Sequence, residues 1–415
     1  MKTTKPFDIS KEIVWLAWEQ VKANKGAAGA DGETIKQFES NLKSNLYKLW
    51  NRMSSGAYFP SPVKTVKIPK KDGGERSLNI PSVTDRIAQT VAKMYLEPKL
   101  EPYFHKDSYG YRPNKSAHQA LETTRKRCWK NDWVLEFDIK GLFDNIDRKL
   151  LMKAVRKHTD SRWIILYIER WLTSSIILED GTQIKQDKGI PQGGVISPIL
   201  SNLFMHYVFD KWMEKNFPNI PFCRYADDGL SHHRTEAEAL RMKEILGKRF
   251  LECGLEMHPE KTKIVYCKDS DRREKHPITS FDFLGYTFRP RRSKNRNGKF
   301  FINFSPAMSD KAGKTIRQEV RGWKLHLRSD KSLMDLSRMF RANIQGWINY
   351  YGRFYKSGMY PTLKHINNKL TLWALRKFKK KKGHKRCTEH WLGKIAKEKP
   401  LLFPHWKLGI RPMVG

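Results

Sequence analysis

The sequence predicts a mixed α/β front part followed by a small, basic, helical back part. Short apolar runs at residues 133–139 and 222–230 contain carboxylates at or near their ends, which is typical of buried strands that lead into turns. From residue 333 onward, apolar residues recur at steps of three and four, which is typical of helices. The charge also changes along the chain, because residues 284–415 hold 32 basic and only 6 acidic residues. A length of 415 residues is enough for two or three domains with a large core.

The overall charge points to a polyanionic partner. The chain carries 80 Lys and Arg residues against 43 Asp and Glu residues, a formal net charge of +37. Hydrophobic residues make up 39% of the chain and aromatic residues 12%, which argues against disorder. Because so much positive charge repels itself, nucleic acid is the first candidate partner and an anionic membrane surface the second.

The sequence also disfavours several classes of protein. The longest apolar runs, such as residues 163–168, are far shorter than the roughly 20 residues that a membrane-spanning helix needs. The first ten residues lack the apolar core of a secretory signal. The 5 cysteines are odd in number and form no CxxC pair, which disfavours a disulfide framework and a zinc site. We therefore expect a cytoplasmic protein with no membrane and no zinc among its partners.

The front part is predicted to begin with a helix. Ser10 precedes apolar residues at helical spacing and is its expected N-cap. Residues 26–32 are expected to form a loop, and residues 63–68 and 77–80 the strands of a hairpin with a Gly-rich tip. Further along, the apolar spacing of residues 201–215 predicts another helix.

Three apolar runs of the front part are predicted to be buried strands. Residues 133–139 form the first, and residues 222–230 form a strand pair that turns at residues 227–229. Residues 281–288 are the third. The polar segment 289–299, which contains Pro and Gly, is predicted to be a loop or linker.

The back part is predicted to be helical. A helix is expected over residues 333–351, with Ser332 and Asp335 at the spacing of a capping box. Pro361 is expected to start the next helix. A helix over residues 311–327 is predicted from a weaker periodicity.

Carboxylates at two strand ends are the candidate reactive groups. Asp138 ends the first strand, and Asp227 and Asp228 are adjacent at a tight turn. Carboxylates from two neighbouring strands can hold two Mg²⁺ ions about 3.5–4 Å apart, an arrangement that serves phosphoryl transfer. The alternative is that Asp227 and Asp228 form an ordinary turn and that Asp138 is a turn residue or a helix cap.

Two segments have the composition of phosphate or ligand contacts. Lys67, Lys70, Lys71 and Arg76 surround the Gly-rich hairpin tip and could bind a triphosphate. A solvated hairpin explains the same residues. The loop of residues 189–198 is rich in Gly and Pro, which permits close approach of a ligand to the backbone or serves only the turn.

Together, these segments resemble the reverse transcriptase domain of group II intron-encoded proteins. Seven motifs occur in the family's order, at residues 70–81, 109–117, 138–143, 191–193, 225–228, 254–262 and 283–286. Residues 24–32 resemble the family's extra N-terminal segment, and residues 344–351 resemble its maturase motif, also called domain X or thumb. The chain departs from the family's longest members, because it lacks the paired cysteines of their zinc-supported endonuclease. The resemblance is therefore to a compact, endonuclease-lacking member, for which the IIC type is our expectation.

The resemblance implies an α/β (α+β) right-hand polymerase fold. Its fingers and palm, with an antiparallel palm sheet, would be followed by an α-helical thumb. The implied domains are an N-terminal extension at 1–62, fingers and palm at 63–290, the thumb at 291–382, and a short basic segment at 383–415. That last segment is expected to be a remnant of a DNA-binding domain.

The resemblance also implies roles for individual residues. Asp138, Asp227 and Asp228 would be catalytic and would bind two Mg²⁺ ions, with Mn²⁺ as a substitute, helped by the carbonyl of Ile139. The residues implied in dNTP binding are Lys70, Arg76, Phe143, Gln192 and Lys261. Among these, Phe143 would be the steric gate that excludes a ribose 2′-hydroxyl, and Lys261 is a candidate proton donor to pyrophosphate.

Further residues are implied in contacts with the nucleic acid. Phe283, Leu284, Gly285 and Tyr286 would form the primer grip. The expected RNA contacts are Arg112, Lys379, Lys380, Lys381 and Lys382. For the four lysines, a solvated helix end is the alternative. The aromatic residues of the back part could stack on bases, but their helical spacing favours the core for Trp347 and Trp373.

The implied function is that of an RNA-directed DNA polymerase and splicing maturase. Its partners would be group II intron RNA, an RNA template with a DNA primer, dNTPs and target DNA, in a bacterial cytoplasmic ribonucleoprotein. It would assist splicing and copy the intron into DNA during retrotransposition. Two alternatives stay open: a domesticated reverse transcriptase in defence or repair, and an RNA-binding splicing factor with a relict polymerase.

Overall fold

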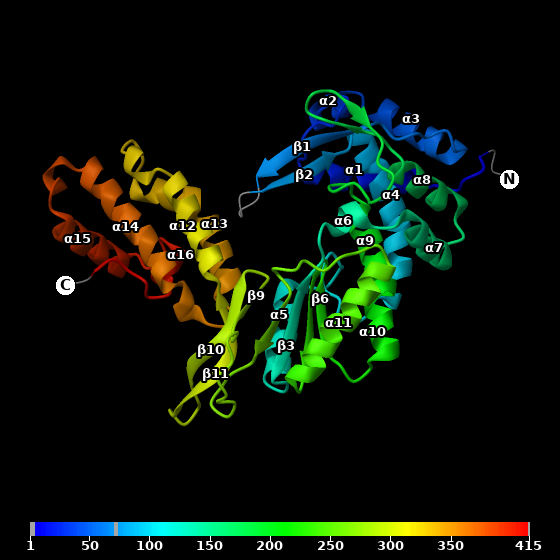
Figure 1. Cartoon of the computed structure of the whole chain (residues 1–415). Coiled ribbons are helices and arrows are strands. Elements are labelled where there is room, and N and C mark those ends of the chain that lie inside the picture. The colour runs from blue at the N-terminus through cyan, green and yellow to red at the C-terminus, as the bar shows by residue number, and fades with distance from the viewer. Residues whose placement is uncertain (1–4, 70–73, 414–415) are drawn as a thin grey trace. The chain divides into compact units, whose positions relative to one another are not determined.

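The computed structural model describes residues 5–69 and 74–413 (Figure 1). The chain divides into two compact units. The first unit comprises Met1–Ala120 with Leu135–Lys263, and the second comprises Leu121–Val134 with Ile264–Gly415. The expected boundaries at residues 62, 290 and 382 stay a prediction.

The N-terminal part of the first unit contains four helices. They are α1 (Lys11–Ala23), α2 (Ile35–Ser40), α3 (Leu42–Ser55) and α4 (Val83–Leu100). The predicted cap of the first helix is confirmed, because the Ser10 hydroxyl accepts a hydrogen bond from the Glu12 amide at 3.1 Å. α1 buries one apolar face that includes Val14, Ala17 and Trp18 and packs against α3 and α4.

The hairpin predicted at residues 63–80 is here called the finger hairpin, after the part of the fold that the resemblance implies. It belongs to a four-stranded sheet of order β2-β1-β4-β5. Its strands are β1 (Val63–Pro69), β2 (Glu75–Ile80), β4 (Ile176–Ile177) and β5 (Gln183–Ile184). β1 pairs antiparallel with β2 and parallel with β4. The predicted hairpin is therefore confirmed, and its sheet is widened by strands that lie about a hundred residues later in the chain.

A second four-stranded sheet has the order β6-β7-β3-β8. Its strands are β3 (Trp133–Asp138), β6 (Phe222–Tyr225), β7 (Asp228–His233) and β8 (Lys263–Tyr266). The neighbouring helices along the chain are α5 (Ala117–Cys128), α6 (Leu142–Asn145), α7 (Arg148–His158), α8 (Arg162–Leu172), α9 (Ser197–Met205), α10 (Lys211–Asn216) and α11 (Glu236–Glu252). A π-helix, η2 (His206–Asp210), joins α9 to α10.

The turn between β6 and β7 lies one residue earlier than the sequence predicts. Tyr225 pairs with Asp228, so Ala226 and Asp227 form the turn and Asp228 is the first residue of β7. Gly229, which the sequence predicts in the turn, instead pairs with Arg224 between the two strands. Only one of the two adjacent carboxylates therefore lies in the turn itself.

The second unit contains a three-stranded sheet of order β11-β10-β9. Its strands are β9 (Phe281–Phe283), β10 (Tyr286–Lys294) and β11 (Phe300–Met308). The predicted loop over residues 289–299 is wrong for residues 289–294, which are the end of β10 and pair antiparallel with β11 as far as Lys294 and Phe300. Only residues 295–299 form the connection between the two strands. The sequence misled here because charged residues lie on exposed positions of a two-stranded ribbon, where polarity does not mark a loop.

The remaining helices of the second unit enclose one apolar core. They are α12 (Asp310–Gly322), α13 (Leu333–Tyr351), α14 (Tyr360–Lys377), α15 (Lys385–Glu398) and α16 (Pro404–Lys407). The predicted capping box of Ser332 and Asp335 is present at the start of α13. Trp373 is 1% exposed and shares the core with Leu392 and Trp406, so residues 385–410 pack with the helices before them. In the part of the chain that the structure describes, no helix is long and apolar enough to cross a membrane.

Candidate active site

One cleft of the first unit gathers six of the residues that the sequence singles out. Its volume is about 680 Å³. The predicted site residues in its lining are Asp138, Ile139, Phe143, Gln192, Asp227 and Lys261. The finger strands contribute Thr65, Ser77 and Asn79 to the same lining. Residues from both sheets of the first unit therefore face one cavity of the size that small-molecule ligands occupy.

The turn of residues 225–228, here called the catalytic turn, carries two of the predicted catalytic residues. Ala226 has φ of 57°, the left-handed region that residues other than glycine rarely adopt. Asp227 lines the cleft, and Asp228 begins β7 beside it. The backbone of the turn is therefore held in an uncommon conformation where the chemistry is expected.

The charge state of Asp228 reflects its crowded surroundings. Burial, and then the negative charges of Asp227 and Asp138, raise the pKa of Asp228 to about 7, while Lys261 acts in the opposite direction. Like charges held together in this way create a site where a cation would stabilise the ionised carboxylates.

Asp138 forms an ion pair with Lys261, another predicted residue of the cleft. Its carboxylate accepts a hydrogen bond from the Lys261 ammonium at 2.6 Å. The backbone supports this pairing, because the Asp138 carbonyl accepts from the His258 amide at 2.8 Å and the Lys140 amide donates to the Glu256 carbonyl at 2.9 Å. The segment that carries Lys261 is thus fixed against the end of β3.

Gly229 permits the close approach of β7 and β3, the strands that carry Asp228 and Asp138. A Cβ atom built on this residue would lie 2.1 Å from the Phe137 ring, a distance that no side chain tolerates. β7 and β3 are neighbours in the sheet. The glycine therefore lets the strand that begins at Asp228 pack on the strand that ends at Asp138.

The donor set fits a hard divalent cation, although it is not preassembled. In the described part of the chain, no group of three or more His, Cys, Asp or Glu side chains is close enough to hold a metal ion. Lys261 engages the Asp138 carboxylate, so a cation would have to displace it. Carboxylates and the Ile139 carbonyl are oxygen donors, which are the ligands that Mg²⁺ prefers.

Phe143 and Gln192 are held by neighbouring segments. Phe143 is 8% exposed, and its carbonyl accepts from the Ile190 amide at 2.7 Å. The Gln192 side-chain amide donates to both carboxylate oxygens of Asp144 at 3.1 Å, and the Gln192 backbone carbonyl accepts from the Asn79 backbone amide at 2.6 Å. Asp144 was not predicted to be a site residue. Its only indication in the sequence is its position directly after Phe143.

The glycines of the loop at 189–198 serve the packing of the protein itself. A Cβ atom on Gly193 would lie 2.3 Å from the Asn79 carbonyl oxygen, and its φ is 115°. A Cβ atom on Gly189, with φ of 78°, would lie 2.7 Å from the Phe143 carbonyl oxygen. The close backbone approach allowed by these glycines is therefore to β2 and to α6.

Two of the predicted dNTP contacts cannot be placed. Lys70 lies outside the described residues. Arg76 pairs through its backbone with Ile68 in the finger hairpin, but its side chain lies outside the described part of the structure. Both roles stay predictions.

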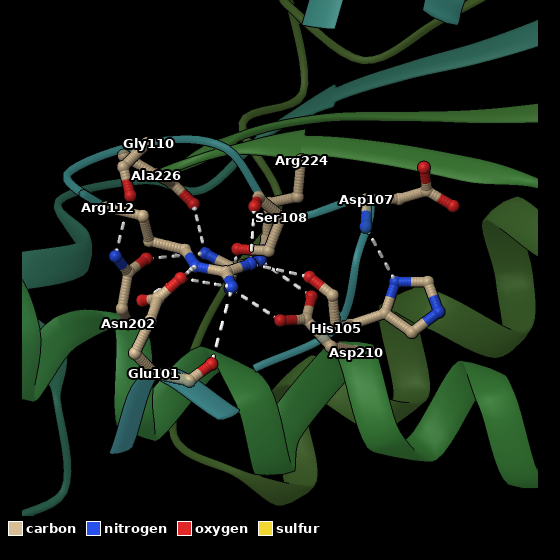
Figure 2. Close-up of polar contacts among 10 residues, drawn as sticks. All are labelled: Glu101, His105, Asp107, Ser108, Gly110, Arg112, Asn202, Asp210, Arg224 and Ala226. Atoms are coloured by element: carbon tan, nitrogen blue, oxygen red, sulfur yellow. Dashed lines mark hydrogen bonds and ion pairs between the residues drawn. The ribbon is translucent and has the colours of Figure 1, made fainter. Parts of the chain in front are cut away.

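The prediction that Arg112 contacts RNA disagrees with the structure. Its side chain is 5% exposed and donates to the Glu101 carboxylate at 2.6 Å and to the carbonyls of His105 and Ser108, both at 2.7 Å (Figure 2). A buried guanidinium whose donors are all taken by protein acceptors has no donors left for phosphate. Arg112 therefore holds the segment around residue 108 in place.

The predicted primer grip is a tight hairpin of the second unit. Phe283 ends β9, Tyr286 begins β10, and Leu284 and Gly285 form the turn with φ of 51° and 77°. Such a pair of positive φ values is typical of two-residue hairpin turns. The Tyr350 hydroxyl donates to the Leu284 carbonyl at 2.9 Å, and the Tyr286 hydroxyl donates to the Tyr350 carbonyl. Tyr350 was a candidate for base stacking, but it is half-buried and holds this turn.

Tyr350→Phe is expected to lower the free energy of unfolding by about 1 kcal/mol, because the Leu284 carbonyl would lose its hydrogen bond. Urea denaturation of the wild-type and variant proteins checks this. Tyr360→Phe, at an exposed tyrosine of the same unit, serves as the control. Equal losses in the two variants would contradict a specific role of the Tyr350 hydroxyl.

The four lysines at 379–382 follow α14. Lys379, Lys380 and Lys382 are exposed, and the Lys381 ammonium lies 4.5 Å from the centre of the Trp391 ring. The run therefore presents charge at the surface of the second unit. Their contact with RNA stays a prediction.

Comparison with known proteins gives a consistent family. A family model described as "Reverse transcriptase (RNA-dependent DNA polymerase)" matches residues 68–288, and one described as "Group II intron, maturase-specific domain" matches residues 313–391. Protein YkfC of Escherichia coli (strain K12) is 31% identical over 315 residues, which cover 66% of this chain and 79% of that protein. Group II intron-encoded protein LtrA of Lactococcus lactis subsp. cremoris is 33% identical over 198 residues, which cover 47% of this chain and 32% of that protein.

The reverse transcriptase match extends over more than half of the chain and includes every described residue of the cleft from Ser77 to Lys261. The maturase-specific match lies within the helical part of the second unit. The chain therefore belongs to the reverse transcriptase family, as a right-hand polymerase that carries a group II intron maturase domain and is a reverse transcriptase and maturase.

Proposed function

We propose that the protein copies an RNA template into DNA by extending a DNA primer with dNTPs. One observation carries this proposal: a single cleft is lined by Asp138, Asp227 and Phe143, with Asp228 beside it. These groups come from segments almost a hundred residues apart. A relict polymerase would have no physical need to keep acidic strand ends and a buried aromatic residue on one cavity.

Reverse transcriptases of this family use divalent metal ions. We propose Mg²⁺, with Mn²⁺ as a substitute, held in a pair by Asp138, Asp227, Asp228 and the carbonyl of Ile139. Two such ions activate the primer 3′-hydroxyl and stabilise the leaving oxygen of the triphosphate. Lys261 is now paired with Asp138, and it would supply its ammonium to the pyrophosphate if cation binding drew the Asp138 carboxylate away from it.

The other cleft residues would select and hold the nucleotide. Phe143 would close the space that a ribose 2′-hydroxyl needs, and Gln192, braced by Asp144, would line the nascent base pair. Lys70 and Arg76 would bind the triphosphate. The rigid support of Phe143 and Gln192 favours this reading, because selectivity requires side chains that cannot move aside.

We further propose that the protein binds group II intron RNA, promotes its splicing and copies the intron at its target DNA. The match of residues 313–391 to the maturase-specific domain supports this role. The excess of basic residues after residue 283 supplies the charge that RNA binding needs. The same polymerase chemistry would serve a domesticated enzyme in defence or repair, but the maturase match favours the intron. A cytoplasmic ribonucleoprotein stays the predicted location.

Primer extension with purified protein tests the polymerase proposal. A DNA primer annealed to an RNA template should be extended with dNTPs and Mg²⁺, and a chelator should stop the reaction. Splicing of a group II intron RNA with and without the protein tests the maturase proposal separately. No extension on any primed RNA, from protein that melts cooperatively, would contradict the enzymatic role.

Replacing Lys379, Lys380, Lys381 and Lys382 by glutamine is expected to weaken RNA binding. Because each phosphate contact releases a counterion, loss of four contacts should reduce the slope of log K against log salt concentration by at most about 3. Filter binding at several salt concentrations measures the slope. The matched control replaces four exposed basic residues of the first unit by glutamine, namely Lys215, Arg241, Lys243 and Lys248. An unchanged slope in the fourfold variant would place the run away from phosphates.

A further inference from the structure

Arg224, directly before the catalytic turn, is fully buried. Its side chain is 1% exposed, and the Asp210 side chain that pairs with it is 0% exposed (Figure 2). The guanidinium donates in bidentate fashion to Asp210, from Nε to Oδ1 at 2.7 Å and from Nη2 to Oδ2 at 2.6 Å. A buried ion pair of this kind is retained only where its geometry is satisfied completely.

The other three N–H groups of Arg224 also have acceptors. Nη2 donates to the Ser108 hydroxyl at 2.9 Å, and Nη1 donates to the Asn202 side-chain oxygen at 3.1 Å and to the Ala226 carbonyl at 3.0 Å. All five donors of the guanidinium are therefore used. Lysine has three donors on a single nitrogen and cannot reproduce this planar fork.

One of these bonds reaches the catalytic turn. The Ala226 carbonyl belongs to the residue with φ of 57°, and it directly precedes the amide of Asp227. Fixing this carbonyl fixes the peptide plane between Ala226 and Asp227. The Arg224 guanidinium therefore constrains the direction in which the chain presents Asp227 and Asp228.

The segment of residues 107–110 also supports the turn, through contacts with Arg224 and Ala226. The Arg224 amide donates to the Asp107 carbonyl at 3.0 Å, and the Tyr109 amide donates to the Arg224 carbonyl at 2.9 Å. A Cβ atom on Gly110 would lie 2.5 Å from the Ala226 amide nitrogen. This explains the glycine of the family segment at 109–113, which fits closely against the catalytic turn.

The π-helix η2 helps to assemble the acceptors of Arg224. Asn202 and Asp210 lie eight residues apart, which in an uninterrupted α-helix would offset them by about 80° around the axis. The wider π turn between them reduces this offset, and both side chains reach the same guanidinium. Single π turns are often found at functional sites.

We propose that Arg224, held by Asp210, is a positioning residue that sets the catalytic turn for DNA synthesis. It does not touch substrate. It acts through the Ala226 carbonyl, and the proposal rests on the proposed polymerase function of Asp227 and Asp228. The sequence alone does not predict this role, because an arginine within a predicted strand does not reveal which side chains will surround it.

Arg224→Lys tests the proposal, with Arg272→Lys as its matched control. Arg272 is 12% exposed and also donates from two nitrogens to one carboxylate, that of Asp269, but its other acceptors are the carbonyls of Cys128 and Asn131 and the Asp132 side chain, which lie outside the turn and its supporting segment. Arg224→Lys is expected to lower kcat roughly 10²-fold, the effect of a displacement of about 1 Å. The KM for dNTP should change by less than about threefold. Arg272→Lys should keep kcat per folded molecule near that of the wild type.

Hydrogen–deuterium exchange of the metal-free protein gives a readout that does not depend on activity. The peptide that spans residues 222–233 should exchange faster in Arg224→Lys and at the wild-type rate in Arg272→Lys, at equal folded fraction. Equal exchange and equal kcat in wild type and Arg224→Lys would overturn the proposal. Equal losses of kcat in the two variants would also overturn it, because they would show a general effect of burial.

Ser108→Ala is the milder variant should Arg224→Lys not fold. It removes one acceptor of Arg224 and leaves the ion pair with Asp210 intact. A several-fold loss of kcat with faster exchange of the turn supports the proposal, and no change in either opposes it. If the wild-type protein extends no primer, the polymerase proposal fails, while the exchange measurements still decide whether Arg224 holds the turn.

Discussion

Replacing Asp227 or Asp228 by alanine is expected to reduce DNA synthesis by roughly 10³-fold or more, because each variant removes a carboxylate that the metal-dependent step needs. The melting temperature should stay the same or rise. Asp228 is buried next to two like charges that raise its pKa to about 7, so its removal relieves repulsion and desolvation. Single-turnover primer extension and thermal melting measure the two effects.

The control for these variants is Asp180→Ala, at an exposed carboxylate in the turn between β4 and β5. It should leave extension within about twofold of the wild type. RNA binding should persist in all three variants, because the basic second unit is unchanged. Retention of substantial polymerase activity in either Asp227→Ala or Asp228→Ala would remove these residues from the reaction.

Phe143→Ala is expected to raise the incorporation of rNTPs relative to dNTPs by about 10- to 100-fold, because the space for a 2′-hydroxyl would open. Phe143 is 8% exposed and its backbone is fixed by Ile190, so the wild-type ring cannot yield to a bulkier sugar. The ratio of kcat/KM for a matched rNTP and dNTP pair measures the change.

Phe143→Val provides the graded comparison for this experiment. Its smaller loss of volume should give an intermediate ratio, whereas a general loss of folding would lower the use of both nucleotides together. An rNTP-to-dNTP ratio that is unchanged in Phe143→Ala would rule out the steric-gate role. Cavity formation should also lower stability by about 3–5 kcal/mol, so rates are compared per folded molecule.

Local patterns were sufficient for several helices and strands, among them α1, α13 and β3. Ser10 and the capping box of Ser332 and Asp335 were predicted correctly, because a cap depends on a few neighbouring residues. The ribbon of β10 and β11 was missed because pairing between strands, not local polarity, makes those residues extended. The turn at Asp227 was displaced by one residue for the same reason, since its register depends on the partner strand.

The candidate site was predicted unevenly. Carboxylates, the aromatic gate and the motif glutamine have side chains whose chemistry is readable from the chain. Arg112 was predicted wrongly and Arg224 was missed, because the chain order does not show which acceptors the fold brings to a buried guanidinium, whether they are nearby, as Glu101 is for Arg112, or distant, as Ser108 is for Arg224. Tyr350 and Asp144 were missed as supports for the same reason, since each stabilises a residue on another segment.

The sequence by itself determined the kind of chemistry: acidic strand ends for metal, a large positive charge for nucleic acid, and a chain order that resembles one family. Only the tertiary structure decided that Arg112 is engaged by protein acceptors, which glycines serve packing, and what holds the catalytic turn. The physical reason is that charge and periodicity are properties of the local chain, whereas the saturation of buried donors depends on contacts between distant segments. Arg112 and Arg224 look alike in the sequence, and only their acceptors distinguish a loop support from a residue that positions Asp227 and Asp228.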